Sequence, residues 1–155
     1  MSSIKIICPG KVREKWMQQG IEEYIRRLSR YAKVNITQVD DAPDSWPLEK
    51  ALQEEASRIM AKIKLGDYVI ALDLKGIQSD SVTFSGLIQD WLQIGGSEII
   101  FVIGGSNGLA SELLDRAQQK LCLSKMTFTH QMTRLVLLEQ CYRAFKINRN
   151  EPYHK

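Results

Sequence analysis

Three short segments combine glycine with polar side chains, and each adjoins an apolar run. They are residues 72–76 (Leu-Asp-Leu-Lys-Gly), 104–108 (Gly-Gly-Ser-Asn-Gly) and 123–128 (Leu-Ser-Lys-Met-Thr-Phe). Glycine lets the backbone adopt positive φ and approach a ligand closely, so main-chain N–H and C=O groups there can recognise an adenine or a carboxylate. The spacing matches neither the dinucleotide fingerprint nor a P-loop, so a tight strand-to-helix turn is the simpler alternative.

The C-terminal part of the chain carries side chains that can move protons or hold a nucleobase. Glu139 and Arg143 are four residues apart and share one face of a predicted helix, where a surface ion pair is the simpler interpretation. His130 is equally compatible with a loop or cap role. Tyr153 and His154 lie in a tail that would ordinarily be frayed, yet a Tyr and a His beside basic groups suit base stacking and phosphate contact.

Other chemistries find little support. Two histidines and three widely spaced cysteines provide no metal-ligand spacing, so we expect no metal. Ser106 does not lie in the Gly-x-Ser-x-Gly context of a hydrolase nucleophile. The odd number of cysteines argues against a disulfide framework and for a reducing compartment. We find neither a signal peptide nor an apolar run near the roughly 20 residues that span a bilayer, and therefore expect a cytoplasmic protein without a membrane partner.

The elements that position these residues follow from the alternation of two apolar periods. Period two predicts strands, and a period of about 3.6 predicts helices between them. The expected strands cover residues 4–8, 34–39, 68–73, 98–103 and 121–123. The expected helices cover about 14–30, 48–64, 82–94, 110–120 and 131–146. Strict alternation predicts an α/β fold with a mostly parallel sheet of five to six strands and helices on both faces.

The third and fourth strands should be central, because Val-Ile-Ala-Leu and Ile-Ile-Phe-Val-Ile lack the in/out alternation of half-exposed strands. Ligands of open α/β sheets bind beyond the carboxyl ends of the strands, so the three glycine and polar segments should form one pocket. The last helix is apolar around more of its circumference than one core-facing stripe requires, which indicates burial against a second surface, as in a homodimer.

Length and charge are those of one globular domain, covering residues 1–155. Residues 1–33 carry 8 basic and 3 acidic side chains, residues 34–115 carry 5 and 13, and residues 116–155 carry 8 and 2. Two basic ends that met in space would form a surface for a polyanion, although ordinary solvated helix faces explain the same pattern. The total of +3 is too small for strong non-specific nucleic-acid binding.

Four stretches of the sequence resemble the ribosomal RNA large subunit methyltransferase H family. They are residues 101–109, residues 123–128 with His130-Gln131, residues 138–145 around Leu-Glu-Gln and Tyr-Arg-Ala-Phe, and the C-terminal Glu-Pro-Tyr-His-Lys. The resemblance covers essentially the whole chain. Two positions depart from the pattern: Thr129 stands where the family has Pro, and Asn150 where Gly is usual.

The resemblance implies a SPOUT-class enzyme, in which the C-terminal part of the sheet is threaded into a trefoil knot that forms the S-adenosylmethionine pocket. It further implies a homodimer that methylates N3 of a pseudouridine in helix 69 of 23S rRNA on the assembled 70S ribosome, with no role for DNA. The implied cofactor-binding residues are Leu72, Gly104, Gly105, Leu123, Ser124, Lys125, Met126, Thr127 and Phe128.

The resemblance also suggests catalytic roles at the C-terminus. An imide N3 carries a proton that must leave, so either Glu139 or His130 would accept or relay it. Arg143 would stabilise negative charge on the base oxygens, and Tyr153 with His154 would hold the target nucleotide. Two rival interpretations remain: a non-enzymatic ribosome- or rRNA-binding module, and a different small-nucleotide enzyme of flavodoxin-like build. Calorimetry with S-adenosylmethionine would separate the first of these from a methyltransferase.

Overall fold

The computed structural model describes all 155 residues as an α/β fold with one parallel five-stranded sheet. The strands are β1 (Ser2–Pro9), β2 (Ala32–Val39), β3 (Val69–Ile77), β4 (Glu98–Val102) and β5 (Gln119–Leu121), in the spatial order β2-β1-β4-β3-β5. Every pairing is parallel. β4 and β3 are interior strands, which confirms the expectation drawn from their apolar runs.

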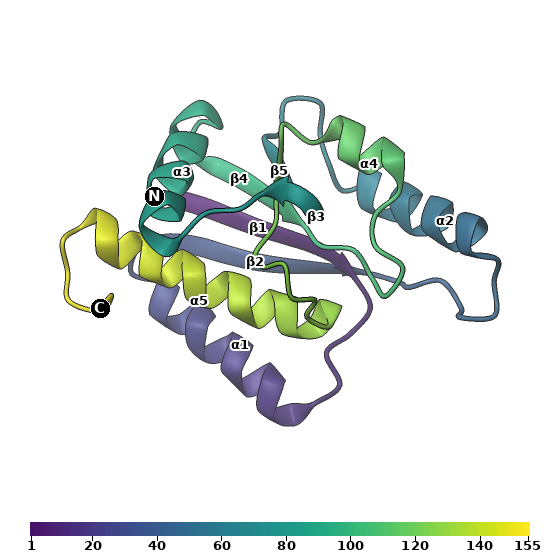
Figure 1. Cartoon of the computed structure of the whole chain (residues 1–155), viewed down its shortest axis with the longest axis horizontal. Helices are drawn as coiled ribbons and strands as arrows, with labels where there is room; N and C mark the ends of the chain where they lie inside the picture. The colour runs from purple at the N-terminus through teal and green to yellow at the C-terminus, as the bar shows by residue number, and fades with distance from the viewer.

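Helices cover both faces of the sheet (Figure 1). They are α1 (Lys15–Leu28), α2 (Leu48–Met60), α3 (Ser81–Ile94), α4 (Ser111–Arg116) and α5 (His130–Asn148). The larger apolar cluster joins α1, α3 and α5 to one face, and a smaller cluster joins α2 and α4 to the other. In α1, Met17, Ile21 and Leu28 recur at helical spacing and all three are buried, which is why apolar periodicity predicted this helix.

The structure corrects the sequence expectation at residues 72–76, which belong to β3 and not to a loop. Leu72 and Ile77 both stand opposite Leu121, so the residues between them form a bulge in β3. Gly76 makes this possible, because a Cβ there would lie 2.6 Å from the backbone nitrogen of Leu121. Apolar periodicity does not register a bulge, since periodicity carries no information about the partner strand.

A second correction concerns the helix expected over residues 110–120. It ends at Arg116, and Gln119–Leu121 pairs with β3 as the edge strand β5. Between them, the Gln118 side chain accepts a hydrogen bond from the backbone of Val69 at 2.8 Å. Pairing with β3 therefore overrides the local helical preference of this segment.

The helix α5 runs antiparallel to the strands, from the carboxyl edge of the sheet back to its amino edge (Figure 1). Near its start, Arg134 bonds the carbonyl of Pro9, the last residue of β1. Beyond its end, Glu151 accepts a hydrogen bond from Tyr31, which directly precedes β2. None of the helices is both long and apolar enough to cross a membrane.

Candidate functional site at two ends of helix α5

The three predicted pocket segments leave the sheet from neighbouring strands. β3 lies between β4 and β5, with Ala71 opposite Val102 and Leu72 opposite Leu121. The backbone N–H of Cys122 then bonds the carbonyl of Ile77 at 2.9 Å, which holds the chain beyond β5 against the end of β3. The segments that start at Leu72, Gly104 and Leu123 are therefore neighbours at the carboxyl edge of the sheet, and that they form one pocket stays a prediction.

The glycines of residues 104–108 form a closed turn. Gly105 and Gly108 are bridged, and the N–H of Gly108 donates to the carbonyl of Gly105 at 3.1 Å. Gly108 has φ +82°, and a Cβ on Gly104 would collide with the carbonyl of Gly108. Only glycine fits at both positions, so this turn presents bare backbone at the end of β4.

Residues 123–128 expose both backbone donors and apolar side chains. Met126 is the one residue of this segment whose N–H bonds within the protein, to the Ser124 hydroxyl at 3.0 Å. The side chains of Met126 and Phe128 are 77% and 37% exposed. Free N–H groups beside exposed apolar side chains are what a ligand with a polar edge and an aromatic face requires.

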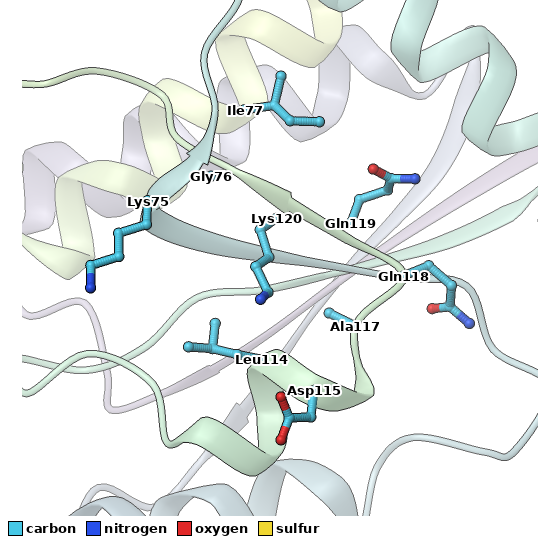
Figure 2. Close-up of a pocket in the computed structure, with 9 residues that line it drawn as sticks. All are labelled: Lys75, Gly76, Ile77, Leu114, Asp115, Ala117, Gln118, Gln119 and Lys120. Atoms are coloured by element: carbon cyan, nitrogen blue, oxygen red, sulfur yellow. The ribbon is translucent and has the colours of Figure 1, made fainter.

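A cavity of about 460 Å³ opens beside this edge, between β3, β5 and α4 (Figure 2). Lys75 and Gly76 line it from the bulge of β3, and Lys120 reaches from β5 towards the helix that carries Leu114 and Asp115. None of the residues predicted to bind the cofactor lines this cavity. It is therefore a neighbour of the predicted pocket and not the pocket itself.

Four of the five predicted catalytic residues meet between the middle of α5 and the docked tail. Two nitrogens of Arg143 bond the two carboxylate oxygens of Glu139, at 3.2 and 3.3 Å. The Tyr153 hydroxyl donates to Glu139 at 3.4 Å, and Arg143 Nη1 lies 3.0 Å from His154 Nδ1. The guanidinium of Arg143 also sits over the Tyr153 ring, 4.7 Å from its centroid. We call Glu139, Arg143, Tyr153 and His154 the tail cluster.

The pKa shifts in the tail cluster favour a charged guanidinium at Arg143 beside a neutral phenol at Tyr153. The hydrogen bond to Glu139 raises the pKa of Arg143. Burial, followed by the hydrogen bond with Tyr24, raises the pKa of the Tyr153 hydroxyl. At neutral pH the cluster therefore offers a guanidinium and a phenol O–H, which are groups that can donate to the oxygens of a nucleobase or a phosphate.

The C-terminal tail is docked and not frayed. Asn150 has φ +55°, and the N–H groups of Asn150 and Glu151 bond the carbonyls of Ile147 and Lys146, which is the Schellman arrangement at a helix end. Glu151 then accepts hydrogen bonds from Tyr31 at 2.6 Å and from Lys146 at 2.9 Å. Asparagine tolerates positive φ better than most residues, which explains how this chain forms the turn without the glycine usual in the resembling family.

His130 lies apart from the other four, at the first turn of α5. A rise of 1.5 Å per residue puts it about 20 Å along the helix from Arg143. Burial is the main cause that lowers the pKa of His130, and the positive charge of Arg134 is the second. The imidazole ring is therefore neutral at neutral pH and can accept a proton. Within one chain, then, His130 lies near the segments predicted to bind the cofactor, whereas the tail cluster extends from the middle of α5 to the docked tail.

Sequence reasoning assigned no role to Arg134, which is fully buried. Its Nη2 donates to the carbonyl of Pro9 at 2.8 Å, but Nε and Nη1 have no partner. Pro9 in turn faces Gly105, whose missing Cβ would stand 3.2 Å from the proline ring. Arg134 thus fixes the end of β1 on which the 104–108 turn rests. An arginine within an apolar helical run was the available signal.

Comparison with known proteins places this geometry in context. Residues 2–154 match a family model described as "Predicted SPOUT methyltransferase". A protein of Desulforamulus reducens named "Ribosomal RNA large subunit methyltransferase H" is 47% identical, covering 100% of both chains. A protein of the same name from Clostridium novyi is 51% identical, covering 99% of both chains.

Solved structures show the same fold at low sequence identity. A probable methyltransferase from Bordetella pertussis has a TM-score of 0.57 at 12% identity, covering 92% of this chain and 96% of its own. A probable methylase family protein from Haemophilus influenzae has a TM-score of 0.55 at 16% identity, covering 98% of this chain and 70% of its own. At this level of identity the likeness concerns the fold alone.

Proposed function

Because this chain belongs to the SPOUT methyltransferase family, we propose that it transfers a methyl group from S-adenosylmethionine to N3 of a pseudouridine in helix 69 of 23S rRNA, on the assembled ribosome. The observation that carries the proposal is the full-length identity of 47% and 51% with proteins named for methylation of large-subunit rRNA. The target nucleotide, the ribosomal context and the cytoplasmic location extend the sequence resemblance described above.

The carboxyl edge of the sheet is the proposed donor site. When bound, S-adenosylmethionine supplies an electrophilic methyl group on a sulfonium. Leu72, Gly104, Gly105 and residues 123–128 would hold it, with the free N–H groups of the last segment available to its polar edges. The bare backbone at Gly104 and the exposed Met126 and Phe128 fit an adenosine-sized group. The tight passage of residues 119–122 past Gly76 is compatible with the trefoil knot that the family implies.

The chain's own contribution to methyl transfer is to position the nucleotide and remove a proton. In-line displacement gains most of its acceleration from holding the reacting atoms at near-attack distance. Arg143 would stabilise the anion that forms when N3 loses its proton, and Tyr153 with His154 would hold the base. The proton would pass to Glu139 or to His130, whose lowered pKa leaves it neutral at physiological pH.

A homodimer would bring the donor loops and the tail cluster, which are separated within one chain, into a single site. The tail cluster begins at Glu139 in the middle of α5, about 14 Å along the helix from His130, so a chain acting alone would leave the base and the donor apart. In a pair with antiparallel α5 helices, the tail cluster of one protomer would reach the donor loops of its partner. The exposed Trp16 on α1 supplies apolar surface for such a contact.

The direct test of function uses methyl-labelled S-adenosylmethionine with intact 70S ribosomes, isolated large subunits and naked 23S rRNA. We expect label in the 23S rRNA of intact ribosomes, at one pseudouridine in helix 69. Calorimetry should show binding of the donor in the absence of ribosomes. Label in a different nucleotide would refute the assigned target. Absence of both label and donor binding would refute the enzyme and favour a binding module.

A further inference from the structure

The sheet has a polar, uncovered region on the face that carries α2. A groove of about 730 Å³ lies there at the amino edge, floored by the first halves of β1 and β2. Lys5, Asn35 and Thr37 point to the same face as Ile7 and Val39, because residues two apart along a strand share a face. The smaller apolar cluster buries Ile7 and Val39 and leaves the amino half open. Parallel sheets are ordinarily covered on both faces, so this opening is unusual.

The groove is basic, and the one hydrogen bond that its lysine ammonium groups form is from Lys5 Nζ to the carbonyl of Lys62, at 3.5 Å. Four lysines line it, namely Lys5, Lys33, Lys62 and Lys64, and none of them forms an ion pair within the chain. The opposing carboxylates are those of Asp67 and Glu98. Asp67 already accepts a hydrogen bond from the backbone of Lys64 at 2.7 Å. Four lysines against two carboxylates give the lining an excess of positive charge.

The groove continues a basic surface that begins at the tail. Arg149 lies over the ring of Tyr31, 4.8 Å from its centroid, and Lys146 lies 5.6 Å from the same centroid. Tyr31 is two residues from Lys33, which lines the groove. Cations thus extend around the amino edge of the sheet, from the tail on the α5 face to the groove on the α2 face.

We propose that this groove binds the phosphodiester backbone of the rRNA that flanks the target nucleotide. The inference rests on the proposed function, since it takes RNA as the substrate. Lysine ammonium groups are suited to phosphates as point charges, and the groove offers no exposed aromatic ring on which a base could stack. The groove therefore increases the affinity for rRNA and fixes the position of the RNA backbone on the protein, while the tail cluster binds the base.

The test compares two double variants with the same change in charge. Lys33→Gln with Lys62→Gln alters the groove, and Lys15→Gln with Lys50→Gln alters exposed lysines outside it. Binding to 70S ribosomes is measured over a series of KCl concentrations. The groove variant should bind about tenfold more weakly, with a salt slope smaller by about 1.4 to 1.8, because two phosphate contacts are lost. Its KM for ribosomes should rise, with kcat and the Kd for S-adenosylmethionine unchanged.

The control variant should bind ribosomes within about twofold of the wild type. Equal weakening of both variants would overturn the proposal, because it would indicate general charge and not a site. Unchanged binding by the groove variant, or a change only in its oligomeric state on sedimentation, would also overturn it. If the wild type binds ribosomes through the groove without transferring a methyl group, the proposed function fails and the groove inference stands.

Discussion

Arg143 is the residue through which the tail cluster is connected, since it contacts Glu139, Tyr153 and His154 together. Four-residue spacing predicts the ion pair with Glu139, but spacing alone cannot show that the tail folds back to complete the group. Arg134 was not identified as a site residue because a sequence does not show which single charge in an apolar helix is buried. Residue types and spacing therefore predicted the Glu139–Arg143 pair but not the side chains that surround it.

Replacing Arg143 by alanine should lower the rate of methyl transfer about 100-fold, because a donor to the developing anion is lost. The affinity for S-adenosylmethionine should stay unchanged, because Arg143 is assigned to the nucleotide base and not to the donor. Single-turnover kinetics and calorimetry measure the two quantities. Arg143→Lys, which keeps the charge but not the two-point contact, should recover part of the rate. A wild-type single-turnover rate in Arg143→Ala would remove this residue from the mechanism.

His130 should make stability sensitive to mild acid. Its pKa is lowered in the folded protein below its ordinary value of 6.5, so the unfolded state binds the proton more readily. The free energy of unfolding should therefore decrease as the pH falls through 6.5 and level off below the folded pKa. Urea denaturation of the wild type and of His130→Gln at a series of pH values measures this, and the variant should lose that part of the dependence. Identical pH profiles would contradict the assignment.

At the scale of elements, all five strands and five helices were predicted from apolar periodicity, and the interior position of β3 and β4 from their unbroken apolar runs. The bulge of β3 and the division between α4 and β5 were not predicted. Both depend on the pairing of β3 with β5, a contact between segments more than 40 residues apart in sequence. Apolar periodicity carries no information about a contact between segments so far apart in sequence. Gly76 was the only residue whose type indicated the close approach of β5.

Gly76→Ala should destabilise the protein by about 3 kcal/mol or more, because its Cβ would press on the backbone of β5, which cannot move aside as a side chain can. Gly86 is the matched control. It lies in α3 with open space around it, so Gly86→Ala should stabilise by about 0.5–1 kcal/mol. Urea unfolding measures both variants. Equal effects at the two positions would show that β5 does not pass Gly76 as described.

Asn150 should control the docking of the tail through its positive φ. Asn150→Ala should weaken the turn by about 1 kcal/mol, since a Cβ without a polar side chain disfavours the left-handed conformation. Asn150→Gly should preserve or strengthen it. Limited proteolysis of the tail reads out docking, with the alanine variant cleaved sooner. Faster cleavage of the glycine variant than of the alanine variant would be incompatible with this turn.

At the scale of the whole molecule, the fold class was predictable and the placement of the site was not. The donor segments converge because parallel strands end at one edge, which topology alone implies. The tail cluster lies away from these segments because α5 runs back along the sheet and the tail folds onto it, and neither periodicity nor spacing fixes the direction in which a last helix docks. The apolar circumference of α5 predicted a second subunit, but the structure packs these side chains against α1, α3 and the sheet of the same chain, and no large apolar side chain of α5 is exposed.

The most direct test of the composite site mixes two variants that are inactive for different reasons. Gly104→Ala should disable the donor turn, and deletion of residues 150–155 should remove the tail. If each site combines the donor loops of one protomer with the tail of its partner, a mixed dimer retains one intact site. Mixing the two inactive variants, with subunit exchange confirmed by mass spectrometry, should therefore restore methylation of 70S ribosomes. Mixed dimers that form and remain inactive would contradict a site shared between subunits.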